Sequence, residues 1–251
     1  MGENQKPLGW SYTNESLNAV LAAFRVHGAG VIDKRKNVLA VCGSGDIPFA
    51  LLEFARQVVV VDNNPAQIDY ARKRADYLLK GDYAHFVEPQ SEGVYDGEKY
   101  CPFLPNKGLR DRYFQDRETI DRIKARLEGL VFCEPQDVFT FLENRNQTFS
   151  AIYLSNVLGT FAGNSFRDFR RKMRPVSKRL SYHGRVFMSD ADHLFPPDIH
   201  WTSLTWHNHL SQEQITLMNK VLKGILIVDK EATYSSRLCE LPTWSPIVLT
   251  K

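Results

Sequence analysis

Short runs of consecutive apolar residues recur along the chain, separated by longer stretches of mixed polarity. Such runs occupy residues 38–41, 58–61 and 130–133, and the segments 149–154 and 184–189 are also strand-like, with polar residues at Ser150, Arg185 and Ser189. Continuous apolar runs of this length are typical of strands in a parallel sheet, because helices cover both of its faces. The intervening stretches show helical spacing, as in the amphipathic segment from Leu17 to Val26. The pattern therefore predicts an α/β fold built on a parallel sheet.

The stretch from Asn37 to Gln67 reads as strand, glycine turn, helix and second strand. Gly43-Ser44-Gly45 follows the first strand, and glycines let a backbone turn sharply and approach a ligand closely. Pro48 suits the first turn of the helix that we expect over residues 49–55. Asp62 ends the second strand. Because ligands of doubly wound sheets lie at the carboxyl ends of the strands, the turn and Asp62 are candidate binding residues.

An acidic residue at the end of the second strand can accept hydrogen bonds from both ribose hydroxyls of an adenosine. That geometry fits two cofactors, NAD and S-adenosylmethionine (SAM). The dinucleotide fingerprint G-x-G-x-x-G needs a third glycine for close helix–strand packing, and Pro48 occupies that position. SAM has no phosphate and requires only the glycine turn beside its amino-acid portion. We therefore expect SAM, with NAD and a ligand-free α/β domain as the alternatives.

Polar residues at the other strand ends complete the candidate cofactor site. Asp137, after the third strand, is a candidate for the adenine amino group and equally for the N-cap of the next helix, and the two roles are compatible. The expected cofactor-binding residues are Cys42, Gly43, Ser44, Gly45, Asp62, Asn63, Gln67, Asp137, Ser155 and Asn156. They converge only if the strands are parallel and share one carboxyl edge.

The chain length of 251 residues suits one large core, and we expect a single SAM-binding transferase domain over 1–251. An N-terminal arm, 1–30, can fold over the cofactor or simply cap the first helix. Residues 81–127 are too long for an ordinary connection. We predict an irregular stretch followed by a charged helix over 110–127, forming a lid-like insertion before the third strand.

Two further strand-like runs, at 224–230 and 244–251, end the chain. Seven strands with a late hairpin are the pattern of the SAM-dependent transferase sheet. The predicted fold is therefore Rossmann-like class I SAM-dependent transferase: a seven-stranded, mostly parallel sheet with helices on both faces.

Composition adds few constraints. The net charge of +3 is mild and does not by itself indicate nucleic acid. The four cysteines are scattered without a C-x-x-C spacing, so we expect no zinc site. The polar N-terminus lacks the apolar core of a signal peptide, and no apolar run approaches the length of a membrane span. We expect a cytoplasmic protein.

The most basic stretch is RDFRRKMRPVSKR, from Arg167 to Arg179. Its default interpretation is a solvated helix face. The alternative is recruitment to an anionic membrane surface or to an acidic substrate. Because no basic patch with interleaved aromatic residues stands out beyond this stretch, we expect no nucleic-acid partner.

Three sequence elements resemble the SAM-dependent 3-amino-3-carboxypropyltransferases of betaine-lipid synthesis. They are Tyr12-x-Asn14-Glu15, Asp62-x-Asn-Pro-Ala-Gln at 62–67, and Tyr-Leu-Ser-Asn at 153–156. Enzymes of that family move the aminocarboxypropyl group of SAM to the hydroxyl of diacylglycerol. The resemblance implies the same transfer here, to a small-molecule or lipid-like acceptor. The chain departs from the family at its glycine turn, which is nearer the general methyltransferase form than the family's S-G-G-C-N.

SAM has three electrophilic carbons on its sulfur, and the position of the acceptor decides which one is attacked. Aminocarboxypropyl transfer leaves methylthioadenosine, whereas methyl transfer, the main alternative, leaves S-adenosylhomocysteine. A non-catalytic SAM-binding protein is a further alternative. An oxygen or nitrogen acceptor must lose its proton, and we predict Asp190 as the base with Tyr12 as its helper. Asp192 is the alternative base and His193 the alternative helper, and the histidines at 200–209 lack the carboxylate spacing of a metal site.

Overall fold

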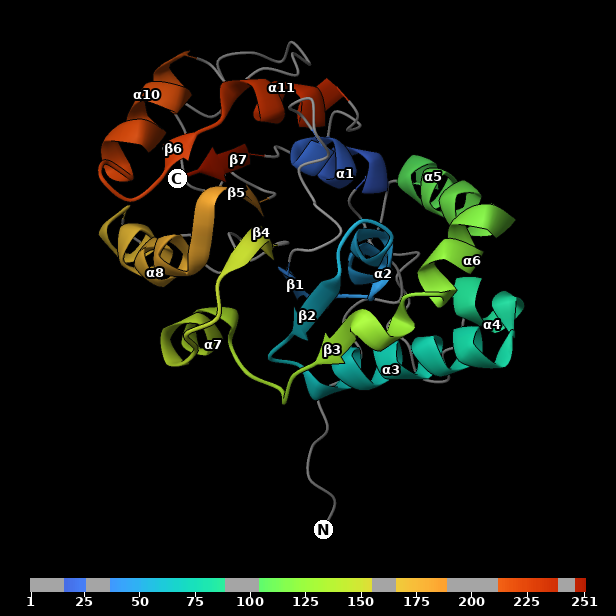
Figure 1. Cartoon of the computed structure of the whole chain (residues 1–251). Coiled ribbons are helices and arrows are strands. Elements are labelled where there is room, and N and C mark those ends of the chain that lie inside the picture. The colour runs from blue at the N-terminus through green and yellow to red at the C-terminus, as the bar shows by residue number, and fades with distance from the viewer. Residues whose placement is uncertain (1–15, 26–36, 89–103, 155–165, 189–211, 239–246) are drawn as a thin grey trace. The chain divides into compact units, whose positions relative to one another are not determined.

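The computed structural model of the chain (Figure 1) describes residues 16–25, 37–88, 104–154, 166–188, 212–238 and 247–251. Its backbone contacts divide the chain into two compact units, one of residues 1–17 and 33–141 and the other of residues 18–32 and 142–251. The seven strands follow the order β3-β2-β1-β4-β5-β7-β6. This confirms the predicted seven-stranded sheet, which is parallel except at β7.

The first unit is built on three parallel strands and the helices that connect them. Val38 of β1 lies opposite Val58 of β2, and Val58 lies opposite Leu130 of β3. Val58–Val61 are buried, as expected of β-branched residues covered on both faces. The strands and the two helices that follow β1 and β2 are β1 Asn37–Val41, α2 Asp46–Leu52, β2 Gln57–Val61, α3 Pro65–Lys80 and β3 Leu130–Phe132.

Between α3 and β3 the first unit carries an inserted helical segment. Its elements are α4 Tyr83–Val87, α5 Leu104–Gln115, α6 Arg117–Lys124 and the 3₁₀ turn η2 Leu127–Gly129. The prediction of one helix over 110–127 is wrong. Asp116 adopts an extended backbone (ψ 111°) and its Oδ2 accepts a hydrogen bond from the Thr119 N–H at 3.1 Å. It therefore ends α5 and caps α6.

The second unit contains the parallel pair β4 and β5 and the helix that joins them. Its first elements are α1 Leu17–Arg25, α7 Val138–Asn144 (which crosses the boundary between the units), β4 Phe149–Leu154, α8 Phe166–Arg179 and β5 Leu180–Met188. β5 begins four residues before the predicted start at Gly184. Its pairing with β4 shifts register between Phe149 and Ala151, and His183 has a φ of 61°. The apolar pattern missed this irregular start.

The C-terminal part of the second unit contains α10 Gln212–Val221, β6 Ile227–Val228, α11 Lys230–Leu238 and β7 Ile247–Thr250. β7 is antiparallel to both β5 and β6. The two C-terminal strands pair as predicted, but α11 lies between them in sequence. Arg185 of β5 is 3% exposed; it donates to the Ala23 carbonyl of α1 at 3.0 Å and pairs with Asp229 at 2.9 Å. It thereby holds α1 and the start of α11 against β5.

Candidate functional site

The glycine turn after β1 has two residues in the left-handed region of backbone space. Gly43 has a φ of 48° and Gly45 a φ of 86°, which L side chains rarely adopt. The space around the two glycines differs. A Cβ on Gly45 would lie 3.0 Å from the Ala71 Cβ, whereas a Cβ on Gly43 would meet no atom of the described residues within 4 Å. Gly45 therefore permits close packing of α3, while Gly43 borders open space at the carboxyl edge.

Asp62 lies directly beside this turn, at the end of β2. Its Oδ2 accepts a hydrogen bond from the Gly43 N–H at 3.0 Å, and its Oδ1 accepts one from the Asn64 N–H at 2.9 Å. Its carbonyl accepts the Gln136 N–H at 2.8 Å, which connects it to the segment after β3. These bonds fix the half-buried carboxylate at the point where β1, β2 and β3 end.

Gln67 and Cys42 connect the glycine turn to α3 through hydrogen bonds. The Gln67 Nε2 donates to the Gly43 carbonyl, and the Gln67 carbonyl accepts from the Cys42 thiol at an Sγ–O distance of 3.5 Å. Burial, followed by the negative charge of Asp62, raises the pKa of Cys42 well above its ordinary value. The Cys42 side chain therefore stays a neutral packing group, so any contact with a ligand falls to its backbone.

We predict that Cys42 resists alkylation in the folded protein, because its thiol is 2% exposed and its pKa is raised. Cys133, which is half-buried, should react with iodoacetamide at pH 8 about tenfold faster or more. Peptide-level mass spectrometry after timed quenching measures both sites. Unfolding in guanidinium should remove the difference, and equal labelling without denaturant would contradict the buried position of Cys42.

Asp46, the first residue of α2, is the most densely paired side chain beside the turn. It is fully buried, and its carboxylate accepts hydrogen bonds from two arginines. Its Oδ1 accepts from Arg74 Nη1 at 2.7 Å and Arg110 Nη2 at 3.2 Å, and its Oδ2 accepts from Arg110 Nε at 3.2 Å. The Ser44 hydroxyl donates to the same Oδ2 at 3.0 Å. Ser44 is thus turned into the protein rather than toward a ligand.

Arg74 of α3 is enclosed by the rings of three phenylalanines. Its guanidinium carbon lies 5.2 Å from the ring centre of Phe49, 5.0 Å from that of Phe86 and 5.8 Å from that of Phe114. Within the described residues, its buried Nη2 has no hydrogen-bond partner. Aromatic faces attract a guanidinium, which explains how this nitrogen is tolerated there. Arg74 Nη1 also donates to the Ser44 carbonyl at 2.8 Å and so holds the glycine turn directly.

The inserted helices hold α2 at both of its ends. Burial by itself lowers the pKa of Arg110, but the Asp46 carboxylate outweighs this and keeps the pKa above its ordinary value. At the other end, Glu53 accepts a hydrogen bond from the Tyr113 hydroxyl at 2.6 Å and pairs with Arg122 at 2.9 Å. The described parts of the insertion therefore support the helix behind the glycine turn. The lid that we predicted over 81–127 stays a prediction, since residues 89–103 lie outside the described part of the chain.

The structure brings together part of the predicted site. Asp62 and Gln67 each form a hydrogen bond with the backbone of Gly43, and Asn63, the residue after Asp62, is exposed. Asp137 caps α7: its Oδ1 accepts the N–H groups of Phe139 at 3.1 Å and Thr140 at 3.0 Å. The predicted residues Tyr12, Ser155, Asn156 and Asp190 lie outside the described residues.

Sequence reasoning missed Asp46, Arg74 and Arg110. An aspartate inside the otherwise apolar run DIPFALL was the available signal. Among the described residues, no group of three or more His, Cys, Asp or Glu side chains is placed to hold a metal ion. The described helices include none with the length and apolar character needed to cross a bilayer.

Comparisons with known proteins were made by sequence and by structure. No protein-family model matches the chain, and no curated protein matches it. Among solved structures, it is similar to the N-methyltransferase NodS from Bradyrhizobium japonicum WM9 in complex with S-adenosyl-L-homocysteine, with 12% identity, a TM-score of 0.47, and coverage of 93% of this chain and 83% of that one. A TehB-like SAM-dependent methyltransferase from Corynebacterium glutamicum has 15% identity, a TM-score of 0.45, and coverage of 94% and 88%.

Proposed function

We propose that this protein is an enzyme, a SAM-dependent group transferase. The observation that carries the proposal is the position of Asp62, fixed by the Gly43 and Asn64 N–H groups at the shared carboxyl edge of β1, β2 and β3. A carboxylate offers about four acceptor positions, so these backbone bonds are compatible with two more from ribose hydroxyls. The open space at Gly43 lies next to this carboxylate and accommodates the amino-acid portion of the cofactor.

The start of α2 favours SAM over NAD. A pyrophosphate needs free N–H groups at a helix N-terminus. Here the Asp46 N–H donates to the Ser44 hydroxyl at 3.3 Å, and Pro48 has no N–H. SAM, which carries no phosphate, does not have this requirement.

The group that is transferred from SAM can be the aminocarboxypropyl group or the methyl group. The resemblance to aminocarboxypropyltransferases rests largely on Asp62-x-Asn-Pro-Ala-Gln, and it supports aminocarboxypropyl transfer to a small-molecule or lipid-like acceptor. However, Asn64 caps α3 by accepting the Ala66 N–H at 3.1 Å, Pro65 takes the first helical position, and Gln67 braces Gly43. These roles position the cofactor for either reaction, so methyl transfer remains the second candidate. Asp190 and Tyr12 remain the predicted base and its helper.

An Asp62→Asn variant is expected to bind SAM about 10- to 100-fold more weakly, because two charge-assisted hydrogen bonds to ribose become neutral ones. Isothermal titration with SAM, S-adenosylhomocysteine and methylthioadenosine measures this, and NADH serves as the rival ligand. Asp69→Asn on α3, whose carboxylate is 71% exposed, is the matched control and should bind as wild type does. Thermal unfolding without ligand reports whether Asp62→Asn keeps its fold.

If NADH binds and the other ligands do not, the protein is an oxidoreductase rather than a transferase. If no adenosyl ligand binds, the proposed function is rejected. If SAM binds, incubation with SAM and a metabolite or lipid extract identifies the reaction by its by-product. Methylthioadenosine supports aminocarboxypropyl transfer, S-adenosylhomocysteine supports methyl transfer, and the absence of both with every extract supports a non-catalytic SAM-binding protein.

A further inference from the structure

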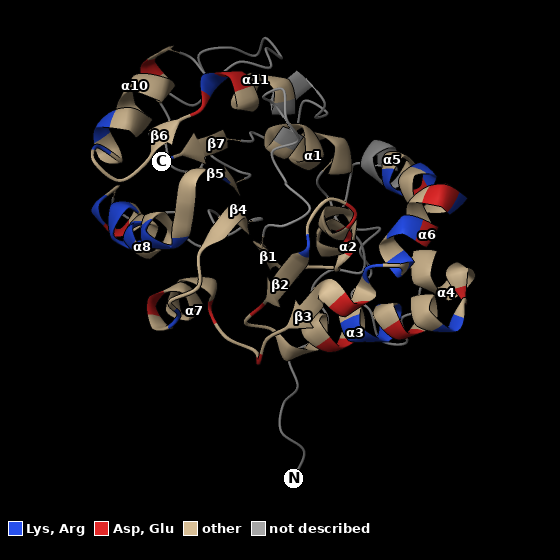
Figure 2. Cartoon of the chain, viewed as in Figure 1, with Lys and Arg blue, Asp and Glu red and all other residues tan. Residues whose placement is uncertain are grey.

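The positive charge of this protein is concentrated in α8. The helix carries seven basic residues and one acidic residue, a net charge of +6, whereas the whole chain carries +3. The rest of the chain is therefore net negative, at −3. Figure 2 shows the concentration of blue on this helix. Such an asymmetry marks one surface as a site for an anionic partner.

Part of this charge has a structural role. Arg170 donates from Nη2 to the Lys223 carbonyl at 2.9 Å, and from Nη1 to the Val221 carbonyl, which ties α8 to the end of α10. Arg179 Nε donates to the Leu142 carbonyl at 3.1 Å and ties α8 to α7. The apolar side of the helix, including Phe169, is buried against the unit. The helix is therefore held rigidly and cannot turn its apolar side outward.

Four other basic residues form a single line on the exposed side of α8. We name Arg167, Arg171, Arg174 and Lys178 the cationic stripe; all four are exposed. Their spacing of i, i+4, i+7 and i+11 places them on one face, over about 16 Å of helix. Arg171 pairs with Asp168 at 3.1 Å, but both side chains are exposed, so that pair is weak. No ion pair within the described residues involves the other three.

The stripe borders a hollow in the surface. A cavity of about 280 Å³ between α7 and α8 is lined by Arg171, Arg174, Lys178 and Arg179, with Glu143 as its one acidic residue. Its charged lining carries a net charge of +3. Arginines, which dominate it, present planar donors that match phosphate oxygens.

We propose, in place of the expectation from the sequence that there is no nucleic-acid partner, that the cationic stripe and this cavity bind the phosphodiester backbone of a single-stranded nucleic acid. The line of charge is longer than a single phosphate group, and a strand can follow it while one phosphate enters the cavity. A membrane is less well matched, because its surface is flat, and none of the exposed large apolar residues of the described chain (Leu79, Val131, Tyr182, Ile227, Tyr234) belongs to α7 or α8. None of the described residues that line the cavity is aromatic, so base stacking is not expected there and recognition should be of the backbone, independent of sequence.

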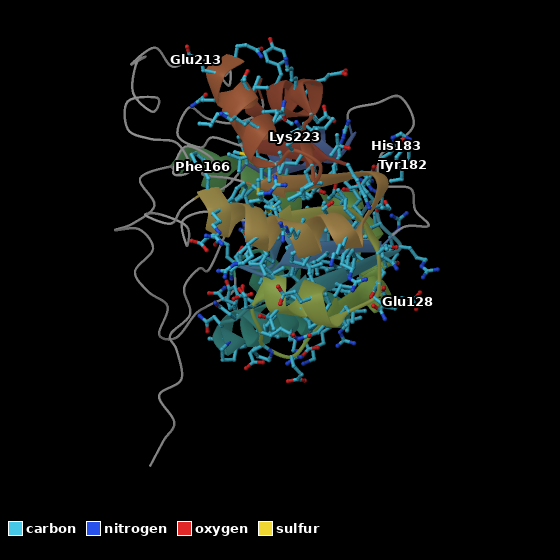
Figure 3. All side chains as sticks on the ribbon, turned by 90° about the vertical axis from the view of Figure 1, so that its left-hand side faces the viewer. Glu128, Phe166, Tyr182, His183, Glu213 and Lys223 are labelled. Atoms are coloured by element: carbon cyan, nitrogen blue, oxygen red, sulfur yellow. The ribbon has the colours of Figure 1, made fainter. Side chains whose placement is uncertain are left out.

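The direction of α8 relates this surface to the reactive edge of the second unit. α8 ends at Arg179 and β5 begins at Leu180, so the Arg167 end lies toward the carboxyl ends of β4 and β5. Figure 3 turns this face toward the viewer: Phe166, at the start of α8, and Tyr182 and His183, early in β5, lie at opposite ends of it. A single-stranded nucleic acid bound along the cationic stripe would therefore extend toward the carboxyl edge of the sheet, where ligands of doubly wound sheets bind.

The test is fluorescence anisotropy with a labelled single-stranded RNA of mixed sequence, in the absence of SAM, at several salt concentrations. The triple variant R171Q/R174Q/K178Q should bind at least about tenfold more weakly, and its salt slope should fall by about 2. The control R56Q/K73Q/K80Q removes the same charge from exposed positions of the first unit, before β2 and on α3, and should bind like wild type. Circular dichroism shows that both variants are folded.

Equal losses in the two triple variants would mean general charge attraction and would overturn the proposal. Binding to vesicles that contain phosphatidylserine without binding to RNA would also overturn the proposal and would assign the stripe to a membrane. Binding to neither RNA nor vesicles would overturn it as well. Because no SAM is present, these outcomes do not depend on the proposed transferase function, and SAM titration tests that function separately.

Discussion

An Asp46→Asn variant is expected to lose about 3–5 kcal/mol of the free energy of unfolding. The substitution keeps the shape of the side chain but removes the negative charge that faces Arg74 and Arg110. These arginines are 0% and 2% exposed. Arg74 would remain as a buried cation without its counter-charge, and Arg110 would keep only its ion pair with Asp111, at 2.7 Å. Guanidinium unfolding followed by circular dichroism at pH 7 measures the loss. The Asp46→Asn variant is expected to be only marginally stable, because the free energy of unfolding of a whole domain is only about 5–15 kcal/mol.

Asp121→Asn is the matched control for the charge change. Asp121 also pairs with an arginine, Arg117, at 3.2 Å, but its side chain is 54% exposed. Its loss should cost no more than about 1 kcal/mol. A second variant, Asp46→Leu combined with Arg74→Met and Arg110→Met, should recover much of the stability lost in Asp46→Asn, because it leaves no buried cation without a counter-charge. A cost of under about 1 kcal/mol for Asp46→Asn would contradict the buried pairing.

These ion pairs mark the limit of what the sequence could predict. The runs at 38–41 and 58–61 predict β1 and β2 because a parallel strand buried on both faces leaves a local pattern. The convergence of Gly43, Asp62 and Gln67 follows, since parallel strands end at one edge. Arg74 and Arg110, in contrast, lie 28 and 64 residues from Asp46. No periodicity relates residues so distant, so their pairing appears only once the chain is folded.

Local polar chemistry explains the other differences. The charged run at 110–127 has helical composition throughout, and the extended backbone of Asp116 alone divides it into two helices. Seven basic residues in α8 look alike in the sequence, but only the fold separates Arg170 and Arg179, which bond to backbone carbonyls, from the exposed cationic stripe. Composition therefore indicated a charged helix without indicating which residues are available to a partner.

A Gly45→Ala variant is expected to lose about 2–5 kcal/mol of stability, from two separate causes. An alanine with a φ of 86° costs about 1–2 kcal/mol, because its Cβ crowds the following carbonyl. The new Cβ would also lie 3.0 Å from the Ala71 Cβ and 3.1 Å from the Phe49 ring, and such overpacking adds about 1–3 kcal/mol. Chemical unfolding measures the sum. SAM binding should weaken only as far as the turn is displaced.

Gly43→Ala separates stability from binding in the same turn. Its φ of 48° carries a backbone cost of about 1–2 kcal/mol, but its Cβ meets no atom of the described part of the chain within 4 Å, so overpacking adds nothing to that cost. The methyl group would instead enter the open space beside Asp62 in which we place the cofactor. Gly43→Ala should therefore be the more stable variant in unfolding and the weaker SAM binder in titration. If Gly43→Ala binds SAM as tightly as wild type while remaining folded, the cofactor does not lie against the glycine turn, and Asp62 must be reassigned to holding the turn alone.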